Sequence, residues 1–233
     1  MADLSKFTEY AKSFFLQRAA GYCLIILASL FVICPLGVLQ TEFDDNCLLY
    51  SEVQYQLYNN TVGPGGGGMV VWRMKFGPQS VCQYNLAVSA IFSLIYALVM
   101  VLGYIFLYIR DREKNEIDLG QIAFLVHGVL EVVVVVLMLV SACTISHGFT
   151  TLCDQFTDTG LPGYTVDSCS HVQTHNWRGY DASNFFVCLA VATAGSWFQF
   201  IFWLLQTVFV MWKLWRLNML PVLPDWMKRG SSA

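Results

Sequence analysis

The sequence predicts an all-α membrane protein: a four-transmembrane-helix bundle with two disulfide-stapled extracellular loops and a small β-hairpin in the first loop. Three observations lead to this fold class. The 233 residues are 56% hydrophobic and only 12% charged, with a mean hydropathy of +0.54, and so little charge cannot cover a surface that faces water. Four charge-poor stretches are long enough to cross about 30 Å of hydrocarbon as helices. Half of the eight cysteines fall between these stretches.

The four stretches divide the chain into alternating spans and connections. None of them shows the two-residue alternation of a barrel strand, so we expect helices, which satisfy their own backbone hydrogen bonds in lipid. The expected order is a cytosolic amphipathic segment 1–18, a first span 19–39, an extracellular loop 40–84, a second span 85–109, a cytosolic loop 110–118, a third span 119–145, an extracellular loop 146–184, a fourth span 185–212 and a cytosolic tail 213–233.

The segment before the first span places Leu4, Phe7 and Ala11 at helical spacing opposite Lys6 and Glu9. A helix lying on the lipid headgroups would use such a face. A straight continuation of the first span into the cytosol fits the same pattern, and both arrangements stay open. A cleaved secretory signal is disfavoured because the apolar run is longer than the roughly 7–15 residues of a signal core. We therefore expect an uncleaved span.

The basic residues predict the orientation in the membrane. Ten of the thirteen Lys and Arg residues lie in segments 1–18, 110–118 and 213–233. The positive-inside rule then places both termini in the cytosol and both long loops outside. The membrane that we expect is the plasma membrane or a secretory vesicle membrane. The triplet that begins at Asn59 is a glycosylation sequon in the first of these loops, so Asn59 is the expected glycan acceptor.

The cysteines of the two long loops predict disulfide bonds. Cys47 and Cys82 lie in the first loop, and Cys153 and Cys169 lie in the second. We favour one bond within each loop, because each pair would then close its own loop in an oxidising compartment. Pairing across the two loops is the alternative.

Two patterns in the loops resemble binding sites of other proteins. The run 63-GPGGGG-68 lacks the Lys-Ser/Thr of a phosphate-binding loop, so we expect it to connect two short strands, 48–57 and 69–76, whose alternation is poor. Cys169, His171 and His175 have a spacing that zinc sites use, but Cys169 is better used in a disulfide and no fourth ligand is adjacent. We therefore expect no nucleotide and no metal.

Catalytic chemistry and nucleic-acid binding find no support in the sequence. Four loop acids could supply an acid and a base, but no motif places them beside a nucleophile: Asp154, Asp158, Asp167 and Asp181. No block of Lys and Arg of the kind that binds nucleic acid is present. We therefore expect no enzyme, no cofactor and no nucleic-acid partner.

Glu131 stands near the middle of the third span, in the run 127-HGVLEVVVVVLMLV-140. An acid at the bilayer centre costs about 2.5–3.5 kcal/mol, so it should face protein and not lipid. His127 lies one helical turn earlier on the same face, and Gln199 in the fourth span is the best long-range partner. This intramembrane cluster could fix how the helices pack, hold the helix of another membrane protein or carry protons, and packing is favoured.

Small residues recur at every fourth position on the second and fourth spans, an arrangement that lets helix backbones approach closely: Ser89, Ser93 and Ala97; Ala190 and Ala194; Ala192 and Ser196. We expect them to build the internal bundle, with contact to an outside partner as the alternative.

Several motifs together resemble the transmembrane protein 179 family of four-span proteins. They are 47-CLLYSE-52 followed by the sequon, 82-CQYN-85, 140-VSACTISHGFTTLCD-154, 167-DSC-169 and 194-AGSWFQFIFW-203. More remotely the chain is similar to the synaptogyrin and synaptophysin group of MARVEL-type tetraspans, and it is less similar to claudin-like proteins because their Gly-Leu-Trp signature is absent. The resemblance implies a glycosylated, disulfide-bonded, non-enzymatic membrane protein, and it implies little about mechanism.

Two classes of function follow as expectations. The first is an accessory or adaptor subunit that binds a larger integral membrane protein, such as an ion channel or a receptor, through its helices and outer loops. The alternative is a vesicle membrane protein of the synaptogyrin type that acts in trafficking or membrane organisation. A channel or transporter in its own right comes last, because no inverted repeat or broken pair of helices is visible.

Overall fold

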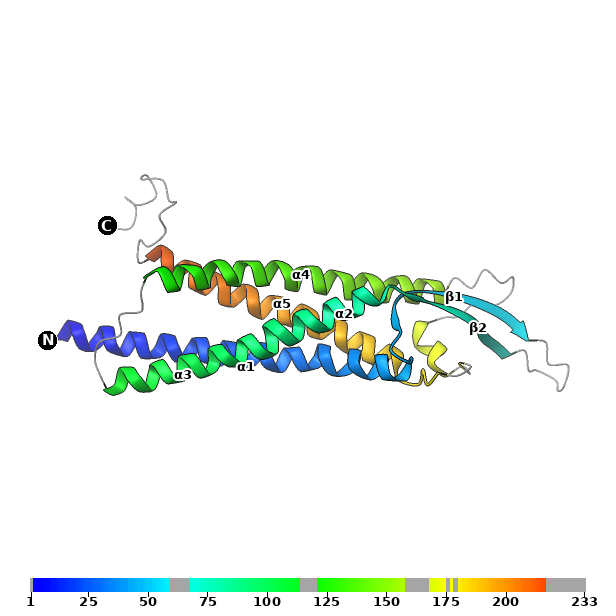
Figure 1. Ribbon diagram of the computed structural model, residues 1–233, viewed down its shortest axis with the longest axis horizontal. Helices are drawn as coiled ribbons and strands as arrows, with labels where there is room; N and C mark the ends of the chain where they lie inside the picture. The colour runs from blue at the N-terminus through cyan, green and yellow to red at the C-terminus, as the bar shows by residue number, and fades with distance from the viewer. Residues whose placement is uncertain are drawn as a thin grey trace, which may run out of the picture. The chain divides into compact units, whose positions relative to one another are not determined.

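The computed structural model describes residues 2–58, 68–113, 121–157, 168–174, 177 and 180–216 (Figure 1). Its helices are α1 (Ala2–Glu42), α2 (Gln79–Val88), the π-helix Ser89–Tyr96, α3 (Ala97–Glu113), α4 (Gln121–Thr157), a short 3₁₀ helix (Cys169–Thr174) and α5 (Phe185–Arg216). Four stretches are long and apolar enough to cross a bilayer: Phe14–Glu42, Gln79–Ile109, Val126–Thr157 and Phe185–Lys213. The predicted four-span helical fold is confirmed, and the chain is an integral multi-pass membrane protein.

Helix α1 runs without interruption from Ala2 to Glu42 and includes Pro35. No glycine or proline lies between Lys6 and Ala20, so nothing in this stretch stops a helix. Of the two arrangements expected for the N-terminal segment, the structure has the straight continuation and not a separate helix.

Helix α4 is longer than the sequence predicts. The expected third span ends at residue 145, but the helix continues to Thr157. The added stretch contains no proline, and it includes Leu152 and Phe156, which are fully buried. The hydrophobic pattern of the sequence does not predict these last turns of α4. Burial of the two side chains stabilises them. The second connection therefore begins twelve residues later than expected, after Thr157.

The second span changes its helical geometry partway through. Residues Ser89–Tyr96 form a π-helix between α2 and α3. Such segments are rare and occur often at functional positions. Ser89 and Ser93 in this segment and Ala97 just after it are fully buried, as expected of small residues at a helix contact.

On α5 the buried small residues are Ala192 and Ser196, whereas Ala190 is half-buried and Ala194 is exposed. The expectation that Ala194 packs within the bundle is therefore wrong. Gly195 explains which face of α5 packs against α1. A Cβ atom at this position would lie 2.8 Å from the Cβ of Phe31 on α1, so only glycine allows the two helices to come this close. The backbones of α1 and α5 approach each other at this glycine.

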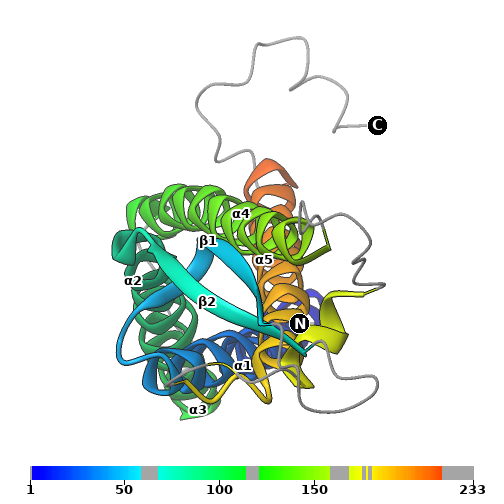
Figure 2. The same ribbon diagram turned by 90° about the vertical axis from the view of Figure 1, so that its right-hand side faces the viewer.

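The predicted hairpin is present as β1 (Cys47–Tyr58) and β2 (Gly68–Gly77), which pair antiparallel and lie side by side in both views (Figures 1 and 2). The strand bounds include the expected stretches 48–57 and 69–76. The glycines at positions 63–67 lie outside the described residues.

The chain divides into two compact units. Unit 1 contains residues 1–27, 91–139 and 198–233, and unit 2 contains residues 28–90 and 140–197. The largest fully buried side chains of unit 1 are Trp203, Arg18 and Tyr22. Unit 2 has an apolar core built from α1, α4, α5 and the start of β1, and its aromatic centre contains Phe43, Trp177 and Phe185.

Candidate functional site

The two charged residues Arg18 and Glu131 form an ion pair in the interior of unit 1. Arg18 lies on α1 and Glu131 on α4, and neither side chain is exposed at all. The Arg18 guanidinium donates a hydrogen bond through Nη2 to Glu131 Oε1. Because an isolated charge in an apolar interior is costly, each residue satisfies the electrostatic need of the other.

Further polar groups complete the environment of Arg18. Nη1 donates to the side-chain oxygen of Gln206 over 2.6 Å and to its backbone oxygen over 3.0 Å. Nη2 also donates to the Tyr22 hydroxyl over 2.8 Å, and this hydroxyl donates to Glu131 Oε1. The guanidinium carbon lies 5.0 Å from the ring centre of Tyr22 and 5.6 Å from that of Tyr104. Hydrogen bonds to Nη1 and Nη2 and the two aromatic rings replace most of the water that Arg18 loses, whereas Nε of Arg18 and Oε2 of Glu131 are buried without a hydrogen-bond partner among the described residues.

His127 joins this group from the same face of α4 as Glu131. Its Nε2 atom lies 3.2 Å from Glu131 Oε1 and 3.0 Å from Arg18 Nη2, and its Nδ1 atom lies 2.8 Å from the Tyr96 hydroxyl. The side chain of His127 is 14% exposed, whereas those of Arg18 and Glu131 are not exposed. We call Arg18, Tyr22, His127, Glu131 and Gln206 the polar cluster.

Sequence reasoning placed His127 beside Glu131 but missed Arg18, Tyr22 and Gln206. Arg18 was counted among the cytosolic charges that orient the chain, so it was not considered as a counter-ion. A signal did exist, because Arg18 and Tyr22 share a helical face and a midspan acid needs a cation or a donor. The amide found in the cluster is that of Gln206. Gln199 is buried earlier on the same helix, and its hydrogen bond to Glu131 stays a prediction.

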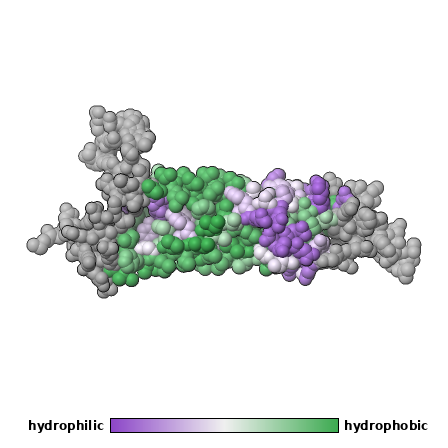
Figure 3. All heavy atoms as spheres, in the orientation of Figure 1, coloured by the Kyte–Doolittle hydropathy of each residue, from purple (hydrophilic) through white to green (hydrophobic). Residues whose placement is uncertain are grey.

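Over the middle of the spans the outward faces are apolar where the structure describes them. On α4 the exposed side chains include Val129, Val133 and Val136, and Figure 3 shows a broad hydrophobic area on the visible surface of the helices with a hydrophilic area beside it. Of the described charged side chains in the four spans, Arg18, Glu131 and Lys213 are buried, Glu42 is half-buried at the end of α1, and Asp154 is exposed in the last turn of α4. Glu131 therefore faces protein, as its cost in lipid requires.

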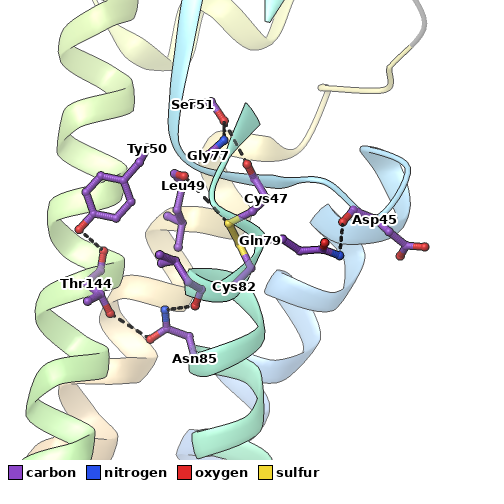
Figure 4. Close-up of a disulfide and its surroundings, with 11 residues drawn as sticks. Asp45, Cys47, Leu49, Tyr50, Ser51, Gly77, Gln79, Cys82, Asn85 and Thr144 are labelled. Atoms are coloured by element: carbon purple, nitrogen blue, oxygen red, sulfur yellow. Dashed lines mark hydrogen bonds between the residues drawn. A yellow bond between two sulfur atoms is a disulfide. The ribbon is translucent and has the colours of Figure 1, made fainter. Parts of the chain in front are cut away.

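Two disulfide bonds hold unit 2 together. Cys47 at the start of β1 is bonded to Cys82 in α2 (Figure 4). Cys153 in α4 is bonded to Cys169 in the 3₁₀ helix. Each bond closes its own connection, so the favoured pairing is confirmed and pairing across the two loops is excluded. The bonds fix the hairpin and the 3₁₀ helix to the ends of the spans.

Polar contacts attach the base of the hairpin to α4. The Tyr50 hydroxyl donates to the Thr144 carbonyl oxygen over 3.2 Å (Figure 4), and the Val53 amide donates to Gln155 Oε1 over 2.9 Å. Burial raises the pKa of the Tyr50 hydroxyl, so the neutral, donating form is retained over a wide pH range. The base of the hairpin is thus held in place by side chains as well as by the disulfide.

The metal and acid patterns of the second loop do not form a site among the described residues. Cys169 is used in a disulfide and His171 is exposed, and no group of three metal-binding side chains was found in the described part of the chain. Asp154 and Asp181 are exposed. Asn59, Asp158, Asp167 and His175 lie outside the described residues.

Comparison with known proteins fits this architecture. A family model described as "Transmembrane protein 179/179B Claudin domain" matches residues 14–225. The chain is 25% identical over 193 residues to "Transmembrane protein 179B" of Danio rerio, covering 82% of this chain and 78% of that protein. No solved structure matches. The description of this family includes a claudin domain. The missing Gly-Leu-Trp signature had predicted less similarity to claudin-like proteins, but a similarity to claudins is part of the family's own description. The chain belongs to the transmembrane protein 179/179B family.

Proposed function

We propose that this chain is a non-enzymatic accessory subunit that binds a larger integral membrane protein, such as an ion channel or a receptor. The observation that carries the proposal is the division of roles between the units. In unit 1 Arg18, Tyr22, Glu131 and Gln206 of the polar cluster are buried and hydrogen-bonded to one another. In unit 2 a disulfide-anchored hairpin ends in strands that leave the packed base. A hairpin that a disulfide fixes to the end of a span suits the recognition element of an adaptor.

The interior of unit 1 gives less support to a channel. Arg18, Tyr22, Glu131 and Trp203 fill it and have no exposed surface. Trp203 Nε1 donates to Ser93 Oγ over 3.0 Å, so this large ring is fixed in place. A water-filled path would have to displace these side chains.

The proposal places the two long connections that carry the disulfides on the extracytoplasmic side, with both termini in the cytosol and a glycan on Asn59. Ten basic residues in the termini and the 110–118 connection, and the disulfides of unit 2, support this orientation. Treatment with a peptide N-glycosidase should increase the gel mobility of the wild type and leave Asn59→Gln unchanged. A wild type that is insensitive to the enzyme would contradict the glycan on Asn59.

Purification of the tagged full chain from its native tissue in mild detergent tests the adaptor role. We expect one larger membrane protein in a fixed ratio to the chain, which survives gel filtration and is absent from a control with an unrelated tetraspan. Recovery of vesicle fusion and sorting proteins in its place would favour the vesicle protein. Recovery of the chain alone would contradict the adaptor role.

A further inference from the structure

The Arg18–Glu131 pair uses only one side of each charged group. A guanidinium has N–H donors on all three of its nitrogens, and a carboxylate has two acceptor oxygens. Nη1 of Arg18 donates to the side-chain and backbone oxygens of Gln206. Three groups contact a single carboxylate oxygen, Glu131 Oε1: Arg18 Nη2, the Tyr22 hydroxyl and His127 Nε2. The pair therefore meets end-on, whereas a bidentate pair would use two nitrogens and both oxygens.

Each of the two charged groups has one polar atom that the pair does not use. Among the described residues, Arg18 Nε donates to no group and Glu131 Oε2 accepts from none, and both atoms are buried. Neither side chain has any exposed surface, so bulk solvent does not reach these atoms directly. A buried polar atom without a hydrogen bond is costly, and the cost is larger in a charged group. A further hydrogen-bonding molecule at these two atoms would remove this cost.

The chemistry of the two atoms defines that molecule. Nε of Arg18 needs an acceptor and Oε2 of Glu131 needs a donor, so the molecule must accept and donate at once. An ion is disfavoured, because Arg18 and Glu131 neutralise each other and an added charge would have no counter-ion in the interior. A proton on Oε2 does not serve either, because it would make this oxygen a donor without an acceptor. Since neither side chain is exposed, the molecule must also be small.

We propose that the polar cluster binds one ordered water molecule, which accepts a hydrogen bond from Arg18 Nε and donates one to Glu131 Oε2. Nε and Nη2 are attached to one carbon, and Oε1 and Oε2 to another, so the water lies beside the contact between Nη2 and Oε1. Buried waters make about two to four hydrogen bonds to polar groups of this kind. His127 contacts both residues and is 14% exposed, so the water exchanges with the surface past this side chain. The inference is independent of the adaptor function.

Water-edited solid-state NMR of the full chain in lipid bilayers tests the proposal, with isotope-labelled arginine and tryptophan. The experiment measures how fast magnetisation passes from water to an N–H group. Trp203 Nε1 is the internal control, because this side chain is equally buried in unit 1 and donates to Ser93 Oγ. Arg18 Nε should receive magnetisation several times faster than Trp203 Nε1. Slow transfer to both groups would overturn the proposal, and so would fast transfer to both, because it would indicate a continuous water path.

Glu131→Gln changes the chemistry of the site with little change in its shape. The amide oxygen should stay with the three donors that contact Oε1, so the amide nitrogen takes the position of Oε2. The water would then meet two donors and no acceptor, and the fast transfer to Arg18 Nε should be lost. Glu52→Gln is the matched control, because it makes the same change on an exposed side chain of unit 2. Fast transfer that persists in Glu131→Gln would contradict the bond to Oε2.

A high-resolution experimental structure of the wild type gives a test that needs no variant. One water should lie within hydrogen-bonding distance, about 2.5–3.2 Å, of both Arg18 Nε and Glu131 Oε2. A direct hydrogen bond between these two atoms would overturn the proposal. A side chain from another part of the chain bonded to either atom would overturn it as well.

Discussion

Gly21 on α1 and Gln206 on α5 are in such close contact that no larger residue fits at position 21 unless the Gln206 side chain moves. A Cβ atom on Gly21 would lie 1.2 Å from Gln206 Nε2. The same Gln206 side chain accepts a hydrogen bond from Arg18. The glycine therefore keeps open the space in which the amide reaches the polar cluster.

Gly21→Ala should destabilise the protein because the Gln206 side chain must rotate away and give up its bond to Arg18. A hydrogen bond to a charged group contributes about 1.5–3 kcal/mol, and we expect a loss of this size in thermal unfolding in detergent. In a Gln206→Ala background the same change should cost much less, because the clash is gone. Gly103→Ala is the control, since no atom lies within 4 Å of a Cβ there. Additive effects of the changes at 21 and 206 would contradict this explanation.

Gly195→Ala should be destabilising for a different reason. A Cβ at 195 would lie 3.0 Å from the backbone carbon and oxygen of Phe31, and backbone atoms cannot rotate away as a side chain can. We expect a cost of about 1–3 kcal/mol from overpacking. Gly37→Ala is the matched control in unit 2, because its Cβ would meet nothing within 4 Å. That variant should be neutral or more stable by up to about 1 kcal/mol, the helix propensity of alanine over glycine.

Glu131→Leu should leave insertion intact but lower the thermal midpoint and weaken partner retention. The change leaves the Arg18 charge buried without its carboxylate, and removal of one partner of a buried pair costs about 3–5 kcal/mol. The double variant Arg18→Leu/Glu131→Leu should recover much of this loss, because no charge remains in the interior. Alkaline extraction of membranes checks insertion, and detergent unfolding checks stability. A double variant less stable than either single variant would contradict this explanation, because removal of the second charge should relieve the loss caused by removal of the first.

Asp181 predicts a pH dependence confined to acid conditions. Hydrogen bonds from the hydroxyl and the backbone amide of Ser183 lower the pKa of its carboxyl, and the amide lies 3.1 Å from Oδ1. Because folding lowers the pKa of Asp181, its carboxylate stabilises the folded protein at pH values above the ordinary aspartate pKa of about 4. This stabilisation is lost as the pH falls through the pKa that Asp181 has in the folded protein. The difference in thermal midpoint between wild type and Asp181→Asn should therefore narrow below about pH 4. A difference that is constant from pH 7 to pH 3 would contradict this account.

Features set by length, hydropathy and local spacing could be predicted from the sequence. The four spans follow from apolar length, and the bonds Cys47–Cys82 and Cys153–Cys169 follow from two cysteines in each connection. The hairpin was predicted in spite of its poor alternation. Its bulge at Trp72 explains the poor pattern, because one extra residue reverses the alternation of β2 at that point.

Features that depend on contacts between distant residues could not be predicted. Arg18 and Glu131 are 113 positions apart, and a charge just before a span normally indicates the headgroup region. The extension of α4 to Thr157 depends on core contacts of Leu152 and Phe156. The inward face of α5 is decided by the approach of Gly195 to Phe31. In each case the local sequence is compatible with more than one structure, and packing between distant residues determines which one forms.

The Arg18–Glu131 pair also has a consequence for biosynthesis. A ribosome that adds about 5–20 residues per second needs roughly 6 to 23 s to proceed from Arg18 to Glu131. Over that interval the first helix has entered the translocon while its counter-charge has not been made, and the arginine must extend toward the headgroups. The arrival of the third helix allows the arginine to turn inward, so a nascent chain released before that moment keeps an uncompensated cation that quality control can detect.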